Sequence, residues 1–263
     1  MQYLSHSQID TFQQCNYRWY LTSKCRIPQA PAEALTVGIA FHTALEAASN
    51  AKIAHNTLSL ERLYEIAEAS LRTACDRDTT QFLPDRFSDM HIKLMPMLDA
   101  FYVRIFPRLT PIAAEEKFLL HITPEIIFTG RIDTETRQHS IIDFKTSNKP
   151  WPTGAEHEKD QATAYLMAKP QAKTVVFVVF PVVNNTCTPQ ILPTQRTPQQ
   201  IAAYSARIRS IAHAMRANEF LPQTGPLCAY CGVLGSCDAG QSWLKQHGKA
   251  AAVPILEQKE YKK

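Results

Sequence analysis

The first half of the chain carries the apolar spacing of helices. Apolar and aromatic side chains recur at the period expected of helices that bury one face. The spacing predicts a short helix and an aromatic turn within 5–23, a helix from about Thr36, and longer helices over 57–78 and 85–106. Pro84 should open the last helix and Pro107 should close it, because proline is tolerated in a first helical turn and not further in.

After Pro111 the pattern changes to that of strands, with β-branched and aromatic residues between turn residues. Three consecutive strands are predicted over 113–122, 125–134 and 139–147, followed by a helix over 160–169, an apolar strand over 174–183, an edge strand over 187–194 and a long helix from Thr197 to about Asn218. A loop rich in glycine and cysteine is predicted over 225–240. This order predicts an α/β core with a helical elaboration over 36–110 and a core over 111–220.

The composition is that of a folded protein. The chain has 263 residues, of which 45% are hydrophobic and 20% charged, enough to bury a core and form one domain over 1–263. Its net charge of +4 is compatible with a polyanionic partner and does not require one. The longest apolar run, Val175–Val183, is half the length of a membrane span, and the first residues lack the pattern of a secretory signal. We therefore expect a soluble, cytoplasmic protein without membrane partners.

Candidate chemistry lies in the second and third of the predicted strands. The alternation of a strand puts Asp143 and Lys145 on one face, and Asp133 ends the strand before. If the two strands form a hairpin, the two carboxylates converge and repel each other. A divalent cation bound between them relieves this repulsion most easily. Mg²⁺ or Mn²⁺ held in this way is a common hydrolytic arrangement. Taken alone, an Asp and a Lys two residues apart are also compatible with an ordinary surface ion pair.

Several short motifs occur together with this pair and in a fixed order. They are His42 within G-x-x-F-H, Asp133 within Gly130-Arg-Ile-Asp133, Asp143-Phe144-Lys145, and Gln161-x-x-x-Tyr165. The series resembles the PD-(D/E)XK nuclease superfamily, in particular its RecB-like branch. The short serine-rich segment Ser5–Tyr20 is similar to the opening of that branch, although Asn16 stands where proline is usual. The resemblance implies a restriction-endonuclease-like core, with a central mixed sheet flanked by helices.

The resemblance also implies roles for individual residues. Asp133, Asp143, His42 and the backbone carbonyl of Phe144 would bind the metal, and Lys145 would act on the attacking water and on the phosphate. Gln161 and Tyr165 lie one helical turn apart and would contact the DNA backbone. Glu115 is similar to the acid that heads the first strand in this branch, with a less defined role. A core histidine at position 42 and ordinary helix packing of Tyr165 are the competing interpretations.

The cysteines form a second constellation. Cys228, Cys231 and Cys237 follow the pattern C-x₂-C-x₅-C, which is one ligand short of a closed tetrahedral site. The AddB-type and CRISPR-associated RecB-like exonucleases supply the fourth ligand from far upstream, where this chain has Cys15. The resemblance therefore implies a [4Fe–4S] cluster, with Zn²⁺ as the chemical alternative. Cys25, Cys75 and Cys187 fit no ligand spacing and are expected to be ordinary thiols.

These observations give a preferred hypothesis and two alternatives. The preferred hypothesis is a Mg²⁺- or Mn²⁺-dependent deoxyribonuclease, an exonuclease rather than an endonuclease, that acts on single strands or duplex ends in recombination, repair or CRISPR adaptation. The chain has no phosphate-binding motif of an ATPase and is therefore not expected to be an ATP-driven helicase itself. A helicase, a recombinase or a CRISPR adaptation protein is its candidate partner. The alternatives are a non-catalytic DNA-binding or assembly subunit with the same fold, and a zinc-ribbon DNA-binding protein.

Overall fold

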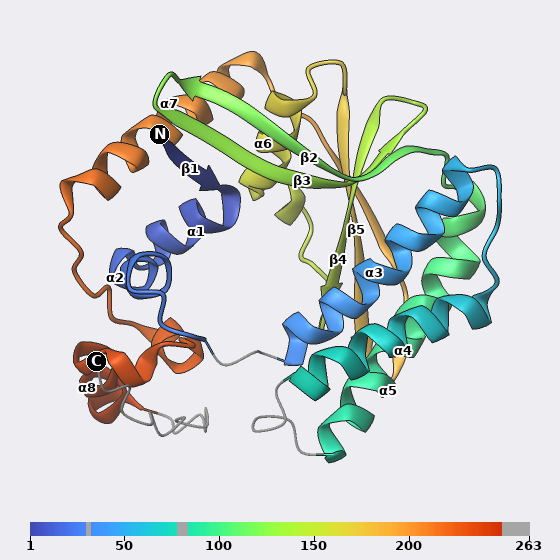
Figure 1. Cartoon of the computed structure of the whole chain (residues 1–263), viewed down its shortest axis with the longest axis horizontal. Helices are drawn as coiled ribbons and strands as arrows, with labels where there is room; N and C mark the ends of the chain where they lie inside the picture. The colour runs from blue at the N-terminus through green and yellow to red at the C-terminus, as the bar shows by residue number, and fades with distance from the viewer. Residues whose placement is uncertain (30–32, 78–83, 249–263) are drawn as a thin grey trace.

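The computed structural model describes residues 1–29, 33–77 and 84–248 of the chain. Within these ranges seven strands form one mixed sheet with helices on both faces (Figure 1), so the predicted α/β fold is confirmed. The strands are β1 (Gln2–Ser5), β2 (Pro111–Thr123), β3 (Ile126–Thr136), β4 (Ser140–Ser147), β5 (Thr174–Val183), β6 (Thr186–Cys187) and β7 (Gln190–Thr194).

The sheet is organised around β3. Along one edge β3 pairs antiparallel with β2 over nearly its whole length. Along the other edge it pairs parallel with β1 in its first half and antiparallel with β4 in its second half. The β3–β4 pairs are Thr134 with Ile142 and Glu135 with Ile141, and the register ends before Asp133 and Asp143. The predicted hairpin therefore exists, and its two acidic residues lie where the strands begin to separate.

Two layers of helices cover the sheet (Figure 1). The helices α3 (Glu33–Ile53), α4 (Leu60–Arg77) and α5 (Pro84–Ala100) pack on one face, and α1 (His6–Gln14), α6 (Asp160–Ala168) and α7 (Pro198–Ala217) pack on the other. On β5, Phe177 and Val179 belong to the core beside α6, whereas Val178 and Phe180 belong to the core beside α3. The continuous apolar sequence of β5 follows from burial on both faces, as predicted.

The remaining elements predicted after Pro111 are also present, with the edge strand predicted over 187–194 divided into β6 and β7. β7 pairs with β5 along an outer edge, and its Pro193 lies opposite Val176, in keeping with the tolerance of edge strands for proline. The long helix α7 begins with a capping box in which the side chains of Thr197 and Gln200 each bond the other residue's backbone N–H. Asn218 ends the helix in the left-handed conformation, at φ 61°.

The predicted helix over 85–106 changes its winding partway. α5 begins at Pro84, as predicted, but its α-helical part ends at Ala100. The chain continues as a π-helical turn at Phe101–Ile105 and a 3₁₀ turn at Phe106–Arg108. All three windings bury apolar residues of this stretch, and the apolar spacing therefore does not distinguish them.

Sequence analysis missed two elements, β1 and the helix α8 (Asp238–His247). Residues 225–240 were predicted as a loop, but they contain two 3₁₀ turns and the start of α8. The segment over 5–23 forms α1, the single turn α2 (Asn16–Trp19) and a π-helical turn (Tyr20–Lys24). α4 begins at Leu60, and its predicted end at 78 lies outside the described residues.

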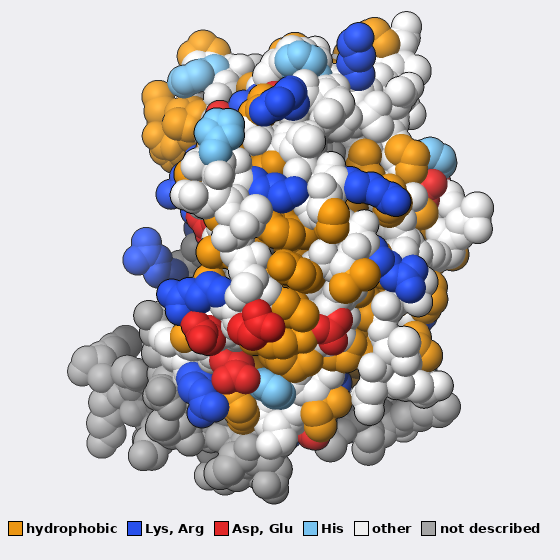
Figure 2. Space-filling model, turned by 90° about the vertical axis from the view of Figure 1, so that its right-hand side faces the viewer, with side chains coloured by type: hydrophobic (Ala, Val, Ile, Leu, Met, Phe, Trp, Pro, Cys, Tyr) orange, Lys and Arg blue, Asp and Glu red, His pale blue; other side chains and the backbone are white. Residues whose placement is uncertain are grey.

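The distribution of charged side chains on this surface does not by itself locate a binding site for a polyanion. Figure 2 shows the side of the molecule on which α3, α4 and α5 lie in Figure 1. Lys and Arg side chains are scattered there among exposed apolar side chains, and Asp and Glu side chains gather beside a histidine. In the described part of the chain, no helix combines the length and the apolar character needed to cross a membrane.

Candidate active site

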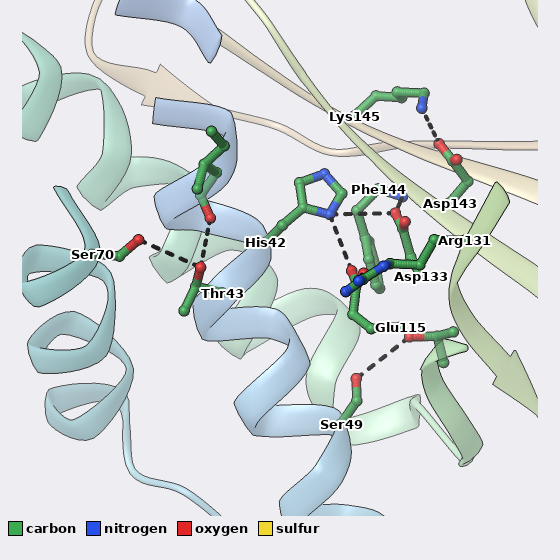
Figure 3. Close-up of polar contacts among 12 residues, drawn as sticks. His42, Thr43, Ser49, Ser70, Glu115, Arg131, Asp133, Asp143, Phe144 and Lys145 are labelled. Carbon is green, nitrogen blue, oxygen red and sulfur yellow. Dashed lines mark hydrogen bonds and ion pairs between the residues drawn. The ribbon is translucent and has the colours of Figure 1, made fainter. Parts of the chain in front are cut away.

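Three side chains that can bind a divalent cation converge beside the sheet. His42 of α3, Glu115 of β2 and Asp133 of β3 each offer a ligand atom, and these atoms lie within 4.8 Å of one another. His42 Nδ1 is 3.5 Å from Asp133 Oδ2 and 3.8 Å from Glu115 Oε1. Figure 3 shows His42 pointing from α3 toward both carboxylates. Glu115, whose role the sequence left undefined, therefore lies in the same group as the two expected ligands.

The position of His42 follows from the residue before it. Phe41 is fully buried and packs edge-on against Phe180 of β5, with ring centroids 4.8 Å apart. This contact fixes the rotation of α3 about its axis, so that the next side chain, about 100° around the helix, faces β2 and β3. His42 keeps 31% of its side chain exposed, unlike a core histidine.

Glu115 reaches the group through an unusual backbone conformation. In the register of β2 with β3, Ala114 pairs with Thr134 and Glu116 pairs with Ile132, which places Glu115 opposite Asp133. Glu115 itself has φ 49°, in a region that side-chain-bearing residues rarely adopt within a strand. Non-glycine residues held in this way cluster at functional sites, because the surrounding structure has to compensate for the strain.

Asp133 is a buried carboxylate at the point where β3 and β4 separate. The backbone N–H of Phe144 donates a hydrogen bond of 2.8 Å to Asp133 Oδ2. The side chain of Phe144 packs edge-on against Phe101 at 5.7 Å, which holds that N–H in place. Burial and repulsion by Asp143 raise the pKa of Asp133 to about 7, against the attraction of His42 and Lys145.

The charges around Asp133 shift the pKa values of its two neighbours in the directions that favour their charged forms. Burial disfavours the charged form of His42, but contact with Glu115 and the charge of Asp133 outweigh it, so its pKa lies above 6.5. Burial similarly opposes ionisation of Glu115, yet His42 and Arg131 bring its pKa below the usual value. Arg131 Nη1 lies 3.2 Å from Glu115 Oε2.

Asp143 lies on β4 next to this group, with its own partners. It is 1% exposed, and Lys145 Nζ lies 2.6 Å from its Oδ2. The hydroxyl of Tyr165 donates a 2.7 Å hydrogen bond to Asp143 Oδ1 and accepts one of the same length from Gln161 Nε2. The alternation predicted for β4 therefore does bring Asp143 and Lys145 together.

This geometry revises the expectation for Tyr165. The sequence predicted a contact with the DNA backbone, but Tyr165 is 2% exposed and its hydroxyl is directed to Asp143. The buried side chain of Tyr165 is not accessible to a phosphate group of DNA. Its hydroxyl instead orients the carboxylate of Asp143. Gln161 is only partly buried, and its predicted DNA contact stays a prediction.

The donor set suits a hard divalent cation. One imidazole nitrogen and several carboxylate oxygens are ligands that Mg²⁺ and Mn²⁺ accept. Asp143 Oδ2 is buried, and the ammonium of Lys145 lies 2.6 Å from it as an ion-pair partner. The burial of Asp133 and its repulsion by Asp143 raise the pKa of Asp133, and a cation between the two carboxylates would relieve that repulsion. The residues present therefore fit a divalent metal.

The four predicted cysteine ligands also come together, far from this group. Cys15, Cys228, Cys231 and Cys237 all line one cavity of about 220 Å³ between α2 and the segment before α8. Cys15 and Cys237 are the N-cap residues of α2 and α8, and their Sγ atoms accept backbone N–H bonds at 3.4 Å. Cys25, Cys75 and Cys187 do not line this cavity, as predicted.

The cavity is shaped for a group bound by sulfur. A Cβ added at Gly240 would lie 3.4 Å from Cys237 Sγ and 3.6 Å from Cys228 Sγ, so a side chain here would fill the space between the thiols. Burial raises the pKa of Cys231 above its usual value, which favours the neutral thiol unless a metal binds. Four sulfur donors line this cavity and are the donor type of both a [4Fe–4S] cluster and zinc, although no three of these four sulfur atoms lie within 4.8 Å of one another in the structure.

Sequence analysis overlooked two residues at these sites. Arg131, inside the G-x-x-D motif, pairs with Glu115, and its place two residues before Asp133 on the same face of a strand could have indicated this. Arg18 lines the cysteine cavity three residues after Cys15, at a spacing of one helical turn.

Comparisons with known proteins agree with this geometry. The model of the PD-(D/E)XK nuclease superfamily matches residues 3–238, so the chain belongs to that superfamily. These nucleases use divalent metal ions, and the group of His42, Glu115 and Asp133 offers ligands for one. A search of curated proteins finds no match.

Two solved structures show a likeness to this chain. A crystal structure of a proposed exonuclease from Eubacterium rectale has a TM-score of 0.53 and 11% identity, with 82% of each chain covered. The protein SSO0001 has a TM-score of 0.39 and 16% identity, covering 75% of this chain and 95% of its own. The first likeness shows a shared fold, and the second is too low to carry an argument.

Proposed function

We propose that the protein is a Mg²⁺- or Mn²⁺-dependent deoxyribonuclease that acts as an exonuclease on single strands or duplex ends. The observation that carries the proposal is the convergence of His42, Glu115 and Asp133 beside the Asp143–Lys145 pair. A group of metal ligands beside a cationic side chain that does not bind the metal suits metal-dependent phosphodiester hydrolysis. The nuclease would act in recombination, repair or CRISPR adaptation. Its partner would be a helicase, a recombinase or an adaptation protein.

Each residue has a defined part in this proposal. His42, Asp133, Asp143 and Glu115 would hold the cation, and the Phe144 carbonyl remains a predicted further ligand. When bound, the cation supplies a water of lowered pKa and neutralises phosphate charge. The Phe144 N–H and the Tyr165 hydroxyl orient the two aspartates from opposite sides.

Lys145 acts from the other side of Asp143. Its side chain is 29% exposed, so it is accessible to substrate, and Asp143 holds its ammonium at 2.6 Å. From Nζ it can hold the attacking water in orientation and stabilise the negative charge that grows on the phosphate. A lysine here contributes a fixed cation without competing for the metal.

Digestion of DNA labelled at one end tests the proposal. Single- and double-stranded oligonucleotides would be incubated with Mg²⁺, Mn²⁺, Ca²⁺ or excess EDTA, and products resolved over time. We expect shortening from an end with Mg²⁺ or Mn²⁺ and none with Ca²⁺, whose larger and looser shell positions water and phosphate poorly. Full cleavage in EDTA would exclude this mechanism. Tight DNA binding without cleavage under any condition would support the non-catalytic subunit instead.

We propose in addition that Cys15, Cys228, Cys231 and Cys237 bind a [4Fe–4S] cluster. The cavity, the N–H bonds to Cys15 and Cys237 and the space left by Gly240 support it. The cluster would join the start of the chain to its last described helix, and its role would be structural.

Metal analysis and visible spectra of anaerobically purified protein test the cluster. Cys231→Ser should lose the brown colour and lower the melting temperature by several degrees, because a freed ligand releases both chain segments. Cys25→Ser is the matched control, since Cys25 is exposed and does not line the cavity. A colourless wild-type protein with one zinc per chain would reject iron–sulfur in favour of zinc.

A further inference from the structure

Arg18 is a partly buried cation, and the described residues offer its charge no ion-pair partner. Its Nε is buried and makes no hydrogen bond. Within the described ranges, its guanidinium has no carboxylate partner, although its backbone N–H donates to Cys15 Sγ at 3.4 Å. The side chain lines the same cavity as the four cysteines. Unpaired buried donors of this kind are costly in proteins and call for a specific explanation.

Other contacts of the segment do not supply that explanation. Trp19 and Phe12, which pack edge-on at 5.5 Å, anchor this turn in the core without help from Arg18. A leucine or methionine would fill the same space without a buried donor. The guanidinium is also close enough to Cys231 to favour its thiolate electrostatically. The charge of Arg18 therefore faces the cysteines.

The charge of a loaded cysteine site matches this cation. Four protonated thiols are neutral and give a guanidinium nothing to pair with. Four thiolates around Zn²⁺, or around an oxidised [4Fe–4S] core, leave two negative charges in a partly buried cavity. Such a charge is expensive in a low-dielectric environment unless a cation compensates for it. The side chain that carries the unpaired N–H lines the cavity in which this anion would be bound.

We propose that Arg18 is the counter-cation of the four-cysteine metal site and donates a hydrogen bond from Nε to one of its sulfur atoms. This inference rests on the proposed metal site and goes beyond it, because it assigns a residue that sets the charge balance and the reduction potential. Hydrogen bonds to sulfur and nearby charge are known to tune both. Arg18 is a positioning and tuning residue, and it takes no part in cleavage.

The test compares three variants with the anaerobically purified wild-type protein. Arg18→Met keeps the length and apolar stem of the side chain and removes its charge, and Arg18→Lys keeps the charge. Arg26→Met is the control, because Arg26 is exposed and does not line the cavity. Circular dichroism first establishes which variants fold. Iron, sulfide and zinc contents, the decay of the visible spectrum in air and the midpoint potential are then measured.

If the site holds iron–sulfur, one-electron reduction by dithionite adds a third negative charge, which Arg18 stabilises. Arg18→Met should then lower the midpoint potential by about 59 mV, equivalent to a tenfold change in the ratio of oxidised to reduced cluster. Its colour should also decay several-fold faster in air. Arg18→Lys should recover part of both effects, and Arg26→Met should match the wild type.

If the site holds zinc, the readout is the rate of zinc transfer to a chromogenic chelator. Arg18→Met should then release zinc several-fold faster than the wild type and Arg26→Met. The inference is overturned if Arg18→Met and Arg18→Lys both keep the wild-type potential, or the wild-type zinc-release rate. Wild-type protein without any bound metal would reject the metal site itself, and with it the role of Arg18. The two failures are therefore distinguished by the wild-type metal content.

Discussion

The hydroxyl of Tyr165 donates a 2.7 Å hydrogen bond to Asp143 Oδ1, from a helix that is otherwise packed in the core. This bond leaves the other oxygen of Asp143 beside Lys145 and toward Asp133. Tyr165, the last member of the Q-x-x-x-Y motif, therefore orients Asp143, which we propose as a metal ligand, and Gln161 donates a hydrogen bond to Tyr165. Outer residues of this kind orient the groups that bind a metal.

Tyr165→Phe removes this bond and leaves the ring packing unchanged. We expect the Mg²⁺ concentration for half-maximal activity to rise about 10-fold, with a smaller loss at saturating metal, because Asp143 becomes less well oriented. Initial rates across a magnesium series measure both. Tyr102→Phe is a suitable control, since the Tyr102 hydroxyl makes no hydrogen bond to a described residue. An unchanged metal dependence would show that Tyr165 serves packing alone.

Lys145→Ala should separate binding from chemistry. The lysine does not bind the metal, so calorimetric metal affinity should be retained while the cleavage rate falls by roughly a hundredfold to a thousandfold. DNA affinity should decrease only slightly, because one phosphate contact is a small part of the electrostatic attraction. Lys149→Ala, at an exposed lysine in the following loop, provides the comparison. If Lys145→Ala cleaves DNA at the wild-type rate, Asp143 and Lys145 form only an ordinary surface ion pair.

Asp133 makes the stability of metal-free protein depend on pH. Its pKa is about 7 in the native state against 3.8 ordinarily, so the folded protein retains a proton between about pH 4 and 7 that the unfolded chain has lost. The contribution of this group to the free energy of unfolding therefore falls as pH rises through that window. Asp133→Asn cannot ionise and should be increasingly more stable than the wild type in EDTA, by up to a few kcal/mol above pH 7.

Urea unfolding at several pH values in EDTA measures this difference. The two proteins should be similar near pH 4, and saturating Mg²⁺ should remove the advantage of Asp133→Asn near pH 8, because metal stabilises the ionised form. A stability difference that does not vary with pH would contradict the raised pKa.

Gly130 is required by a cross-strand contact. It pairs with Phe118 of β2, whose ring lies over the glycine, and a Cβ at position 130 would lie 2.7 Å from Phe118 Cε1. Gly130→Ala should therefore destabilise the protein by about 1–3 kcal/mol, as measured by thermal or urea unfolding. Phe118→Ala in the same chain should make the change at position 130 nearly neutral. Gly235→Ala is the control, since nothing lies within 4 Å of its added Cβ.

Much of the site could be predicted because its residues lie on regular elements. The period of a strand brings Asp143 and Lys145 to one face, and the order of the strands brings Asp133 next to them. Glu115 was harder to place, because its role depends on a positive φ within β2 that no residue pattern encodes. The role of Tyr165 was mistaken because helical spacing fixes a face of α6 but not the partner that this face meets.

The missed elements have similar physical causes. β1 has four residues without a hydrophobic alternation, and it is a strand because the edge of β3 is open beside it. α8 begins at Asp238, directly after Cys237, in a segment whose glycines and cysteines are typical of loops. Tertiary contacts determine the secondary structure of both segments, and local propensity does not.

The parallel pairing of β1 with β3 also constrains the order in which the chain can assemble on the ribosome. Tyr3 pairs with Ile127, so β1 can join the sheet only after β3, more than 120 residues later in the chain, has been synthesised. The cavity that Cys15 lines can be completed only later, after Cys237 has been synthesised. The helices α3 and α4 pack against each other and can form during this interval, because their contacts are local. A nascent chain interrupted before Cys237 would thus hold its acidic residues and yet lack a complete cysteine site.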